Sequence, residues 1–467
     1  MNRHTTFFII TAAAMILSAC SGVKKLTKPQ TDVPAAFTSS AAENDSACLA
    51  DIGWWEFYTD PTLCDFIGRT LAKNKDLLAA AAKIEQMNRL YGAERANRLP
   101  TIGGTVYAND ETNDYSGTGI THDREIGIKV PISWEINLMG ALTWNTRRAK
   151  AEFQASVEDF RAMQMLLIAR TAEAYFRLVA LENEFAIVSH TMESRKESLR
   201  MAKIRFEGGL TSETVYQQAM VEYSTAAALV PNLRKQLNSA RNELTLLMGD
   251  FPQDSLMPYI KRLEPINLDN IPAGVPSDLL KRRPDIRAAE RRLAAATANC
   301  GATYAARFPS LQLGFTPGLE NDELTKFLQS PFTFIVGTIS GPIFDFGRRK
   351  RKYQAAVAAY EQSRFMYEKT ILQAFTEVNS AINAYDNARK SRKLKLNLCD
   401  AAEKYVQLAR LQYNAGTLNY IDVLDAQRRY FDARIDVSNS IRNEYFALID
   451  LYKALGGGWS LPQNQPD

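Results

Sequence analysis

Histidine is scarce in this sequence, with three residues among 467: His4, His122 and His190. Metal centres and catalytic triads that depend on imidazole therefore have almost no residues from which to be built. Long hydrophobic runs are also absent, because no apolar stretch approaches the ~20 residues that a membrane-spanning helix requires. This absence excludes a polytopic inner-membrane transporter.

An excess of charge of either sign is missing as well. The 56 Lys and Arg residues nearly balance the 52 Asp and Glu residues, and the formal net charge is +4. Nucleic-acid-binding domains carry a strongly basic surface, so no nucleic-acid partner is expected. With 46% apolar and 10% aromatic residues, the composition is that of a folded chain with a sizeable core.

Cysteine is rare too, and the chain contains no recognisable catalytic constellation. Of five cysteines, Cys48, Cys64, Cys300 and Cys399 match no zinc or C-x-x-C spacing, and buried small residues are the simplest interpretation. A disulfide between Cys48 and Cys64 is left open. No pattern of nucleophile, base and orienting group is present, so we expect neither an enzyme nor a cofactor or metal site.

The first residues have the pattern of a secretory leader. Arg3 and His4 precede an apolar run, and small residues stand at Ser18 and Ala19. Residues 17–20 read Leu-Ser-Ala-Cys, which matches the bacterial lipoprotein box. We therefore predict a signal peptide over residues 1–19 and acylation of Cys20 with N-palmitoyl and S-diacylglycerol groups. The alternative is an ordinary signal peptide with a chance cysteine.

The rest of the chain consists of two copies of one sequence repeat. Three pairs of glycines are each separated by 207 residues, which is difficult to obtain by chance. The unit is too long for a solenoid repeat and predicts two similar halves packed side by side. The pairs are Gly140 with Gly347, Gly209 with Gly416, and Gly249 with Gly456.

Each half has the same expected order of elements. A helix comes first, over 76–98 and 285–307, and two short strands follow, joined by polar loops over 108–124 and 317–331. Residues 141–207 and 348–415 then contain neither Gly nor Pro, which predicts helices about 100 Å long. A glycine turn and a returning helix of about 40 residues complete each coiled-coil hairpin. Pro231 is expected to break or kink the first returning helix.

Strict alternation of apolar residues defines the strands and gives each strand one apolar face. Four strands cannot close a barrel alone, and open edges do not persist in lipid. Either the sheet is soluble, or several copies pool their strands in a membrane. Aromatic residues flanking the strands, typical of a membrane girdle, favour the second possibility. The alternating residues are Ile126, Ile128, Val130, Ile132 and Trp134, then Leu311, Leu313 and Phe315, then Phe332, Phe334 and Val336.

Three motifs resemble those of a known family. Residues 133–140 read SWEINLMG, residues 342–348 read PIFDFGR, and residues 413–427 read YNAGTLNYIDVLDAQ. The chain resembles the outer membrane efflux proteins, the TolC-like group, and most closely the lipoprotein NodT-type branch of RND tripartite systems. The resemblance spans nearly the whole chain after Cys20.

The resemblance implies a fold class and a function. The fold is mainly α with a membrane β-barrel: long helical hairpins form a periplasmic tunnel, and four strands from each of three protomers form a twelve-stranded outer-membrane barrel. The function is that of a lipid-anchored exit duct of a Gram-negative efflux pump. Its protein partners are a periplasmic membrane-fusion adaptor protein and an inner-membrane transporter of the RND type. The duct itself contacts outer-membrane lipid.

The domain organisation follows from the repeat and the resemblance together. We expect a collar to be built from the segments outside the two repeats. The segments are 1–19 signal peptide, 20–75 acylated N-terminal segment and collar, 76–249 first repeat, 250–284 collar insert, 285–456 second repeat, and 457–467 C-terminal tail.

A periplasmic gate is implied at the end of the second hairpin. By resemblance, Asp422 and Asp425 point into the narrow tunnel end, and Tyr413 joins the contacts that hold it shut. Leu418 stands where some members have an arginine, which favours an apolar constriction over a salt-bridge lock. The alternative for Asp422 and Asp425 is a pair of ordinary solvent-exposed helix carboxylates.

The ends of both hairpins are expected to dock the adaptor, since three protomers present six similar tips. A separate basic run, residues 348–352, is interpreted either as a solvated helix start or as a contact with inner-leaflet headgroups. Two other functions stay open: the exit duct of a type I protein secretion system, and a lipid-tethered periplasmic coiled-coil scaffold. The tip residues are Gly208, Gly209, Leu210, Thr211, Gly416, Thr417, Leu418 and Asn419.

Overall fold

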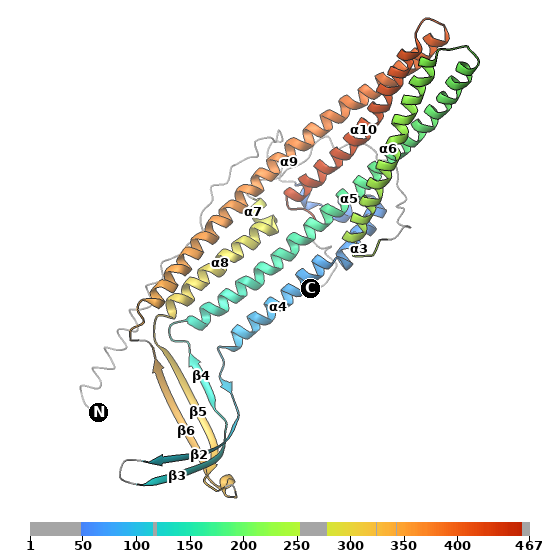
Figure 1. The fold of residues 1–467 in the computed structure, drawn as a ribbon. Coiled ribbons are helices and arrows are strands. Elements are labelled where there is room, and N and C mark those ends of the chain that lie inside the picture. The colour runs from blue at the N-terminus through green and yellow to red at the C-terminus, as the bar shows by residue number, and fades with distance from the viewer. Residues whose placement is uncertain (1–47, 115–118, 253–277, 324, 342, 460–467) are drawn as a thin grey trace. The chain divides into compact units, whose positions relative to one another are not determined.

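The computed structural model describes residues 48–114, 119–252, 278–323, 325–341 and 343–459 (Figure 1). The chain divides into two compact units, and each draws on both sequence repeats. Unit 1 contains Ala82–Val157 and Ala288–Lys369, and unit 2 contains Asp32–Ala81, Glu158–Arg287 and Thr370–Asp467. The signal peptide and Cys20 lie outside the described residues, as does most of the expected collar insert.

Two very long helices dominate the secondary structure. Helices α5 (Ala141–Glu207) and α9 (Arg348–Asn414) have 67 residues each, which confirms the prediction from the missing Gly and Pro. Each is followed by a returning helix of 35 residues, α6 (Glu213–Leu247) and α10 (Tyr420–Ala454).

Pro231 was expected to break or kink the first returning helix, and it does not break it, because α6 continues through Pro231. A proline in a helix interior removes one backbone hydrogen bond. Buried residues on both sides of it, Ala226 and Leu233, hold α6 in place through tertiary packing.

The shorter helices also fall near their expected positions. The helix before each pair of strands is α4 (Lys75–Ala96) in the first repeat and α8 (Pro284–Ala305) in the second. The remaining elements are η2 (Leu49–Asp51), α2 (Trp54–Phe57), α3 (Pro61–Lys73), α7 (Leu279–Arg282) and η4 (Phe327–Gln329).

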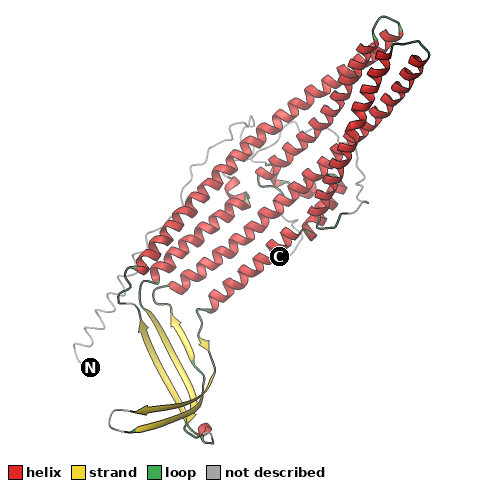
Figure 2. Ribbon diagram, viewed as in Figure 1, coloured by secondary structure: helices red, strands yellow, loops and turns green. Residues whose placement is uncertain are grey.

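One antiparallel sheet in unit 1 contains all six described strands (Figure 2). These six strands correspond to only four passes of the chain across the sheet, because two of the passes are interrupted and each count as two strands. The first pass is interrupted at Gly103 and Gly104, and the second at Val130 and Pro131. The strands are β1 (Thr101–Ile102), β2 (Thr105–Asp114), β3 (Ile120–Lys129), β4 (Ile132–Ile136), β5 (Ser310–Asn321) and β6 (Pro331–Ser340).

The strands extend further than the alternation predicted. Residues 108–124 were expected to be a polar loop, but β2 and β3 stay paired from Thr105 opposite Lys129 to Asp114 opposite Ile120. Their outer parts are rich in Asp, Glu and Asn, which have low strand propensity. Cross-strand pairing overrides that propensity, and one of the pairs is the ion pair between Arg124 and Asp110.

The register assigns the two faces of the sheet. Residues opposite each other in antiparallel strands share a face. Trp134 lies opposite Leu313, and Leu311 lies opposite Ile339, so one face is apolar on β4, β5 and β6. The other face carries Tyr107, whose hydroxyl donates to Glu320 at 2.6 Å.

The register also corrects one expectation about β6. Alternation predicted Phe332, Phe334 and Val336 as the apolar face of this strand, but they lie opposite Gly318, Thr316 and Gly314, on the polar face of the sheet. A Cβ atom at Gly318 would lie 2.4 Å from the Phe332 ring, so this ring covers a glycine of β5.

Both edges of the sheet lack a partner strand within the described protomer. β2 pairs only with β3, and β6 pairs only with β5. Ile335 and Ile339 of β6 are exposed. Open edges with an apolar face do not persist in a membrane unless further strands pair with them.

Unit 2 holds two hydrophobic cores of similar construction. The first joins α3, α5 and α6 around Leu63, Ile67 and Tyr175. Its Tyr175 hydroxyl donates to Asp60 at 2.5 Å, and Asp60 also caps α3 by accepting from the Thr62 backbone at 2.8 Å. The second core joins α9 and α10 around Val378 and Leu451.

The repeated glycines confirm the internal duplication. All six have positive φ angles between 70° and 87°, a region that L side chains rarely adopt. In the part of the chain that the structure describes, no disulfide involves Cys48, Cys64, Cys300 or Cys399, so the Cys48–Cys64 bond that was left open does not form. Among the described residues, no helix combines the length and the hydrophobicity needed to span a membrane.

Candidate gate and docking site at the hairpin ends

The two hairpin ends are built by the same helix-terminating turn. Gly209 has φ 70° and Gly416 has φ 75°. At the first end the Leu210 N–H donates to the Arg205 carbonyl at 2.8 Å, and at the second the Thr417 N–H donates to the Gln412 carbonyl at 3.0 Å. This is the Schellman pattern, in which a left-handed glycine satisfies the last helix carbonyls.

An aromatic pair braces each end. Phe206 of α5 stacks on Tyr216 of α6, with ring centroids 5.8 Å apart and planes at 4°. Tyr413 of α9 contacts Tyr420 of α10, with centroids 5.5 Å apart and planes at 50°. Phe206 and Tyr413 are 207 residues apart and so are equivalent in the two repeats, whereas their partners Tyr216 and Tyr420 are 204 residues apart.

The turns themselves are open to solvent in the protomer. Leu210 is 79% exposed, an unusually large exposure for an apolar side chain. The expected tip residues Gly208, Gly209, Gly416, Thr417 and Asn419 are exposed, whereas Thr211 and Leu418 are half-buried.

Tyr413 and Leu418 lie against their own hairpin. Both pack on a small hydrophobic cluster formed by Val406 and Ala409 of α9 and Val423 and Ala426 of α10. Leu418 therefore holds its turn on the hairpin in addition to any role it has in a constriction.

Asp422 and Asp425 line one hollow, as their spacing on one helix face predicted. Asp422 is in the first turn of α10, and Asp425 follows one turn later. The hollow has a volume of about 640 Å³ and lies between α6 and α10. Its α6 side carries Thr214, Gln217, Gln218, Val221 and Glu222, so polar side chains and carboxylates from two hairpins converge there.

Sequence reasoning missed the partners of Asp425. Arg428 Nη2 lies 2.6 Å from Asp425 Oδ1, and Arg429 Nε lies 2.6 Å from Oδ2. Their spacing of three and four residues on a helix was the signal that could have found them. The hydrogen bonds from Arg429 and Arg428 lower the pKa of the Asp425 carboxyl. The charge of Asp425 is thus partly neutralised by arginines of its own helix.

A buried arginine links the two hairpins next to the hollow. Arg195 of α5 is 7% exposed, and its Nη2 lies 3.0 Å from Glu222 Oε2. Its Nη1 donates to the Glu222 carbonyl at 3.0 Å, and its guanidinium lies 5.3 Å from the Phe431 ring centre of α10. No sequence pattern predicts this contact, because Arg195, Glu222 and Phe431 are far apart in the chain.

Most of the chain matches one known protein family. Residues 66–250 and 275–457 match the model of the outer membrane efflux protein family. The two matched segments correspond to the two repeats.

Individual proteins are similar over nearly their whole length. The chain is 30% identical to the outer membrane protein OprJ of Pseudomonas aeruginosa over 453 residues, covering 96% of this chain and 94% of OprJ. It is 32% identical to the solvent efflux pump outer membrane protein SrpC of Pseudomonas putida over 464 residues, covering 97% and 98%. The open state of the Neisseria gonorrhoeae MtrE outer membrane channel superposes with a TM-score of 0.85 at 27% identity, covering 94% and 99%.

Proposed function

The chain belongs to the outer membrane efflux protein family, and we propose that it is the exit duct of an RND-type pump for small organic molecules, gated at its hairpin ends. It is the outer-membrane channel of an efflux pump in a Gram-negative bacterium, extends into the periplasm and works with an adaptor and an inner-membrane transporter. It forms a trimeric barrel and conducts passively, without an enzymatic step.

One structural observation carries this function. A sheet with one apolar face and two unpaired edges adjoins paired helices about 100 Å long, in a chain that repeats this arrangement twice. A lipid-tethered coiled-coil scaffold has no use for the apolar sheet face. A channel made of several copies uses both the sheet and the hairpins.

The proposed gate consists of Tyr413, Leu418, Asp422 and Asp425. The aromatic contact of Tyr413 with Tyr420 and the hollow lined by Asp422 and Asp425 support it. Opening requires the second hairpin to move relative to the first. The contact of Arg195 with Phe431 opposes that movement, because the guanidinium is buried between the two hairpins.

The proposed docking surface consists of the two turns, 208–211 and 416–419. Their exposure and their shared backbone geometry support binding of a repeated partner element at six similar places in a trimer. The partner is the periplasmic adaptor of the pump.

The proposed cargo is small, organic and apolar or amphiphilic. Support comes from relatives that are named for the efflux of toluene, solvents and antibiotics. The test is a deletion strain, in which intracellular accumulation of a fluorescent organic dye should rise and return to normal with the wild-type gene. Unchanged dye accumulation together with loss of a secreted protein would favour a type I secretion duct instead.

Cys20 is the proposed lipid attachment site. The Leu-Ser-Ala-Cys sequence after an apolar leader supports it. An acyl chain there would place the start of the mature chain at the inner leaflet of the outer membrane.

A further inference from the structure

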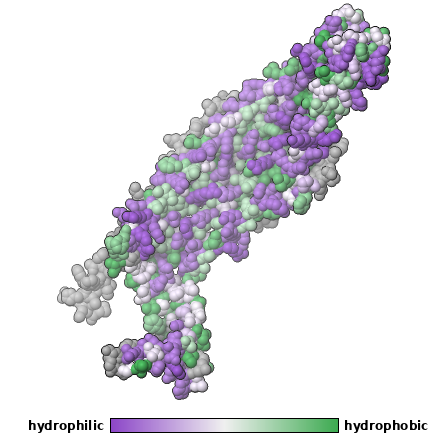
Figure 3. All heavy atoms as spheres, viewed as in Figure 1, coloured by the Kyte–Doolittle hydropathy of each residue, from purple (hydrophilic) through white to green (hydrophobic). Residues whose placement is uncertain are grey.

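The turn between β6 and α9 exposes a cluster of apolar side chains. Ile343 is fully exposed, Phe344 is 74% exposed and Phe346 is 83% exposed. Figure 3 shows a hydrophobic patch beside a hydrophilic one at the start of α9. Such a concentration of exposed apolar surface marks an interaction site.

The backbone of this turn is held in an uncommon conformation. Phe346 has φ 52°, the one positive φ among the described residues other than glycine. Asp345 fixes the turn by accepting from the Gly347 and Arg349 backbone N–H groups, each at 3.1 Å. The result brings the Phe344 and Phe346 rings together, with centroids 4.6 Å apart, on an exposed surface. Strained non-glycine residues that are held this firmly are typical of functional sites.

Five consecutive cations follow the turn, from Arg348 to Lys352. Arg349 is anchored to the protein, because its Nη1 donates to the Ala306 carbonyl at 2.6 Å. Among the described residues, Arg348, Lys350, Arg351 and Lys352 form no ion pair. Cations at a helix N-terminus are disfavoured by the helix dipole, so this position calls for an external anion.

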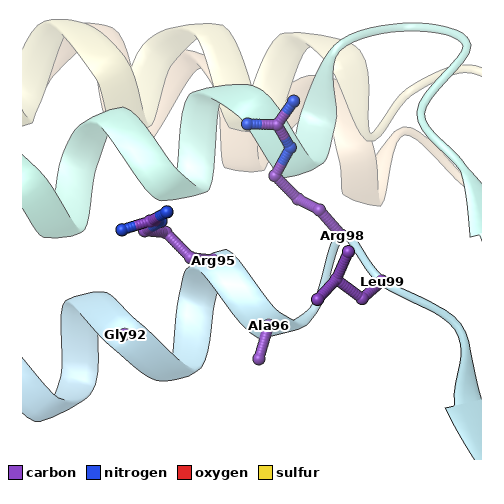
Figure 4. Close-up of a pocket in the computed structure, with 5 residues that line it drawn as sticks. All are labelled: Gly92, Arg95, Ala96, Arg98 and Leu99. Atoms are coloured by element: carbon purple, nitrogen blue, oxygen red, sulfur yellow. The ribbon is translucent and has the colours of Figure 1, made fainter.

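The other segments that connect the sheet to the helices of unit 1 also carry positively charged side chains. Arg147 lies 4.8 Å from the Trp144 ring centre at the start of α5, and Arg307 lies 5.6 Å from the Tyr304 ring centre after α8. Arg95 and Arg98 line a hollow of about 460 Å³ at the end of α4. Figure 4 shows both side chains pointing away from Ala96.

The position of the turn relative to the bilayer follows from the sheet. β6 ends at Ser340, and its exposed Ile335 and Ile339 belong to the apolar, lipid-facing side. Since the helices extend into the periplasm, the turn lies where the barrel leaves the inner leaflet. Aromatic rings and Arg or Lys side chains are enriched at that depth in membrane proteins.

We propose that residues 343–352 form an interfacial anchor that binds the phosphate groups of anionic phospholipids in the inner leaflet. Phe344 and Phe346 insert at the boundary between headgroups and acyl chains. Arg348, Lys350, Arg351 and Lys352 bind the headgroup phosphates, and each cation adds to the attraction of an anionic surface. Another copy of the chain is the less suitable occupant, because the end of its α4 carries Arg95 and Arg98, which would repel the basic run.

Native mass spectrometry of purified trimers tests the headgroup contact. Trimers are mixed with phosphatidylglycerol or phosphatidylcholine, and the bound lipids per trimer are counted. The quadruple variant Arg348→Gln, Lys350→Gln, Arg351→Gln and Lys352→Gln should lose at least half of the excess phosphatidylglycerol that wild type retains. A matched variant with Gln at Lys390, Lys393, Lys404 and Arg410, exposed cations of the same helix, should retain it.

Fluorescence tests the insertion of the aromatic side chains. A Phe344→Trp variant in a Trp134→Phe background is reconstituted into vesicles that contain lipids brominated near the headgroup. The added tryptophan should be quenched by these lipids. An unquenched tryptophan in an intact trimer, or unchanged phosphatidylglycerol retention in the quadruple variant, would overturn the anchor without affecting the efflux function.

Discussion

Arg392 of α9 and Glu444 of α10 form a buried ion pair, with Nε 2.5 Å from Oε2 and Glu444 0% exposed. The residues 207 positions earlier are Phe185 and Leu237, which belong to the hydrophobic core of the first hairpin. One repeat thus has an ion pair where the other has two apolar side chains. Burial raises the pKa of the Glu444 carboxyl, and the Arg392 and Arg389 guanidiniums offset this only in part.

Removing one partner of this pair should destabilise the trimer strongly. Arg392→Ala leaves Glu444 buried without its cation, which should cost about 3–5 kcal/mol. The double variant Arg392→Phe with Glu444→Leu copies the first repeat and should be neutral or more stable. The midpoint of thermal unfolding of detergent-solubilised trimers measures both, and a double variant less stable than Arg392→Ala would contradict the account.

The same carboxyl should make stability depend on pH. A group whose pKa is raised in the folded state stabilises the fold fully below its unfolded pKa of about 4.3, and this contribution is lost as the pH rises through the folded value. Glu444→Gln should therefore flatten the dependence of the unfolding midpoint on pH above about 4.3. If Glu444→Gln leaves the pH dependence of the unfolding midpoint unchanged, the pKa of Glu444 does not differ between the folded and unfolded states.

The charges at the proposed gate should control ion selectivity. Neutralising Asp422 and Asp425 to Asn should lower the cation preference of single channels in planar bilayers. Arg428→Gln with Arg429→Gln should raise it, because Asp425 then loses both cations that offset its charge. Asp432→Asn, an exposed carboxylate further along α10, is the matched control. If the Asp422 and Asp425 double variant keeps its selectivity and its divalent-cation block, these carboxylates do not face the conduction path.

Arg428 and Arg429 should also determine how the cation selectivity of the channel depends on pH. Because Arg429 and Arg428 lower the pKa of Asp425, its carboxylate stays ionised as the pH falls through the ordinary aspartate range near 3.9. The part of the cation preference that Asp425 carries should therefore persist at pH values of about 4. Its loss well above that pH would place Asp425 outside the conduction path.

Changing the turn glycines should uncouple the channel from its adaptor. Gly416→Val or Gly209→Val places a β-branched residue at positive φ, which distorts the turn. Efflux should fail while trimers still assemble in the outer membrane. Ala415→Val, at the exposed residue just before Gly416 in the turn after α9, is the control for side-chain size. Normal drug resistance in Gly416→Val cells with normal protein levels would rule out docking at this turn.

Acylation should depend on a single cysteine. Cys20→Ser should abolish incorporation of a clickable fatty acid into the protein in growing cells. Label that persists in the variant would disprove the assignment of Cys20. Retained export by the unlabelled variant is compatible with the channel function, since the strands and not the acyl chain form the barrel.

Much of the architecture was predictable because it depends on local properties. The absence of Gly and Pro fixes α5 and α9, and the repeated glycines fix the turns through their positive φ angles. The face of Phe334 was not predictable, because it depends on which residue of β5 lies opposite it. The outer part of β2 was missed because its polar side chains resemble a loop until they pair with β3.

The site was predictable in position and only partly in chemistry. The motif around Asp422 and Asp425 located the end of the hairpin, and helix spacing placed both carboxylates in one hollow. The contact of Arg195 with Glu222 and Phe431 joins residues far apart in the chain, so no sequence pattern announces it. The effect of this contact on the charge and rigidity of the hairpin ends can be described only from the folded structure.

Single-channel recording of purified trimers in planar bilayers tests the central claim most directly. A passive duct closed at its hairpin ends should give small, discrete current steps, and Tyr413→Ala with Arg195→Ala should enlarge them several-fold by releasing the second hairpin. Trimers that insert into the bilayer without conducting in either form would contradict the account.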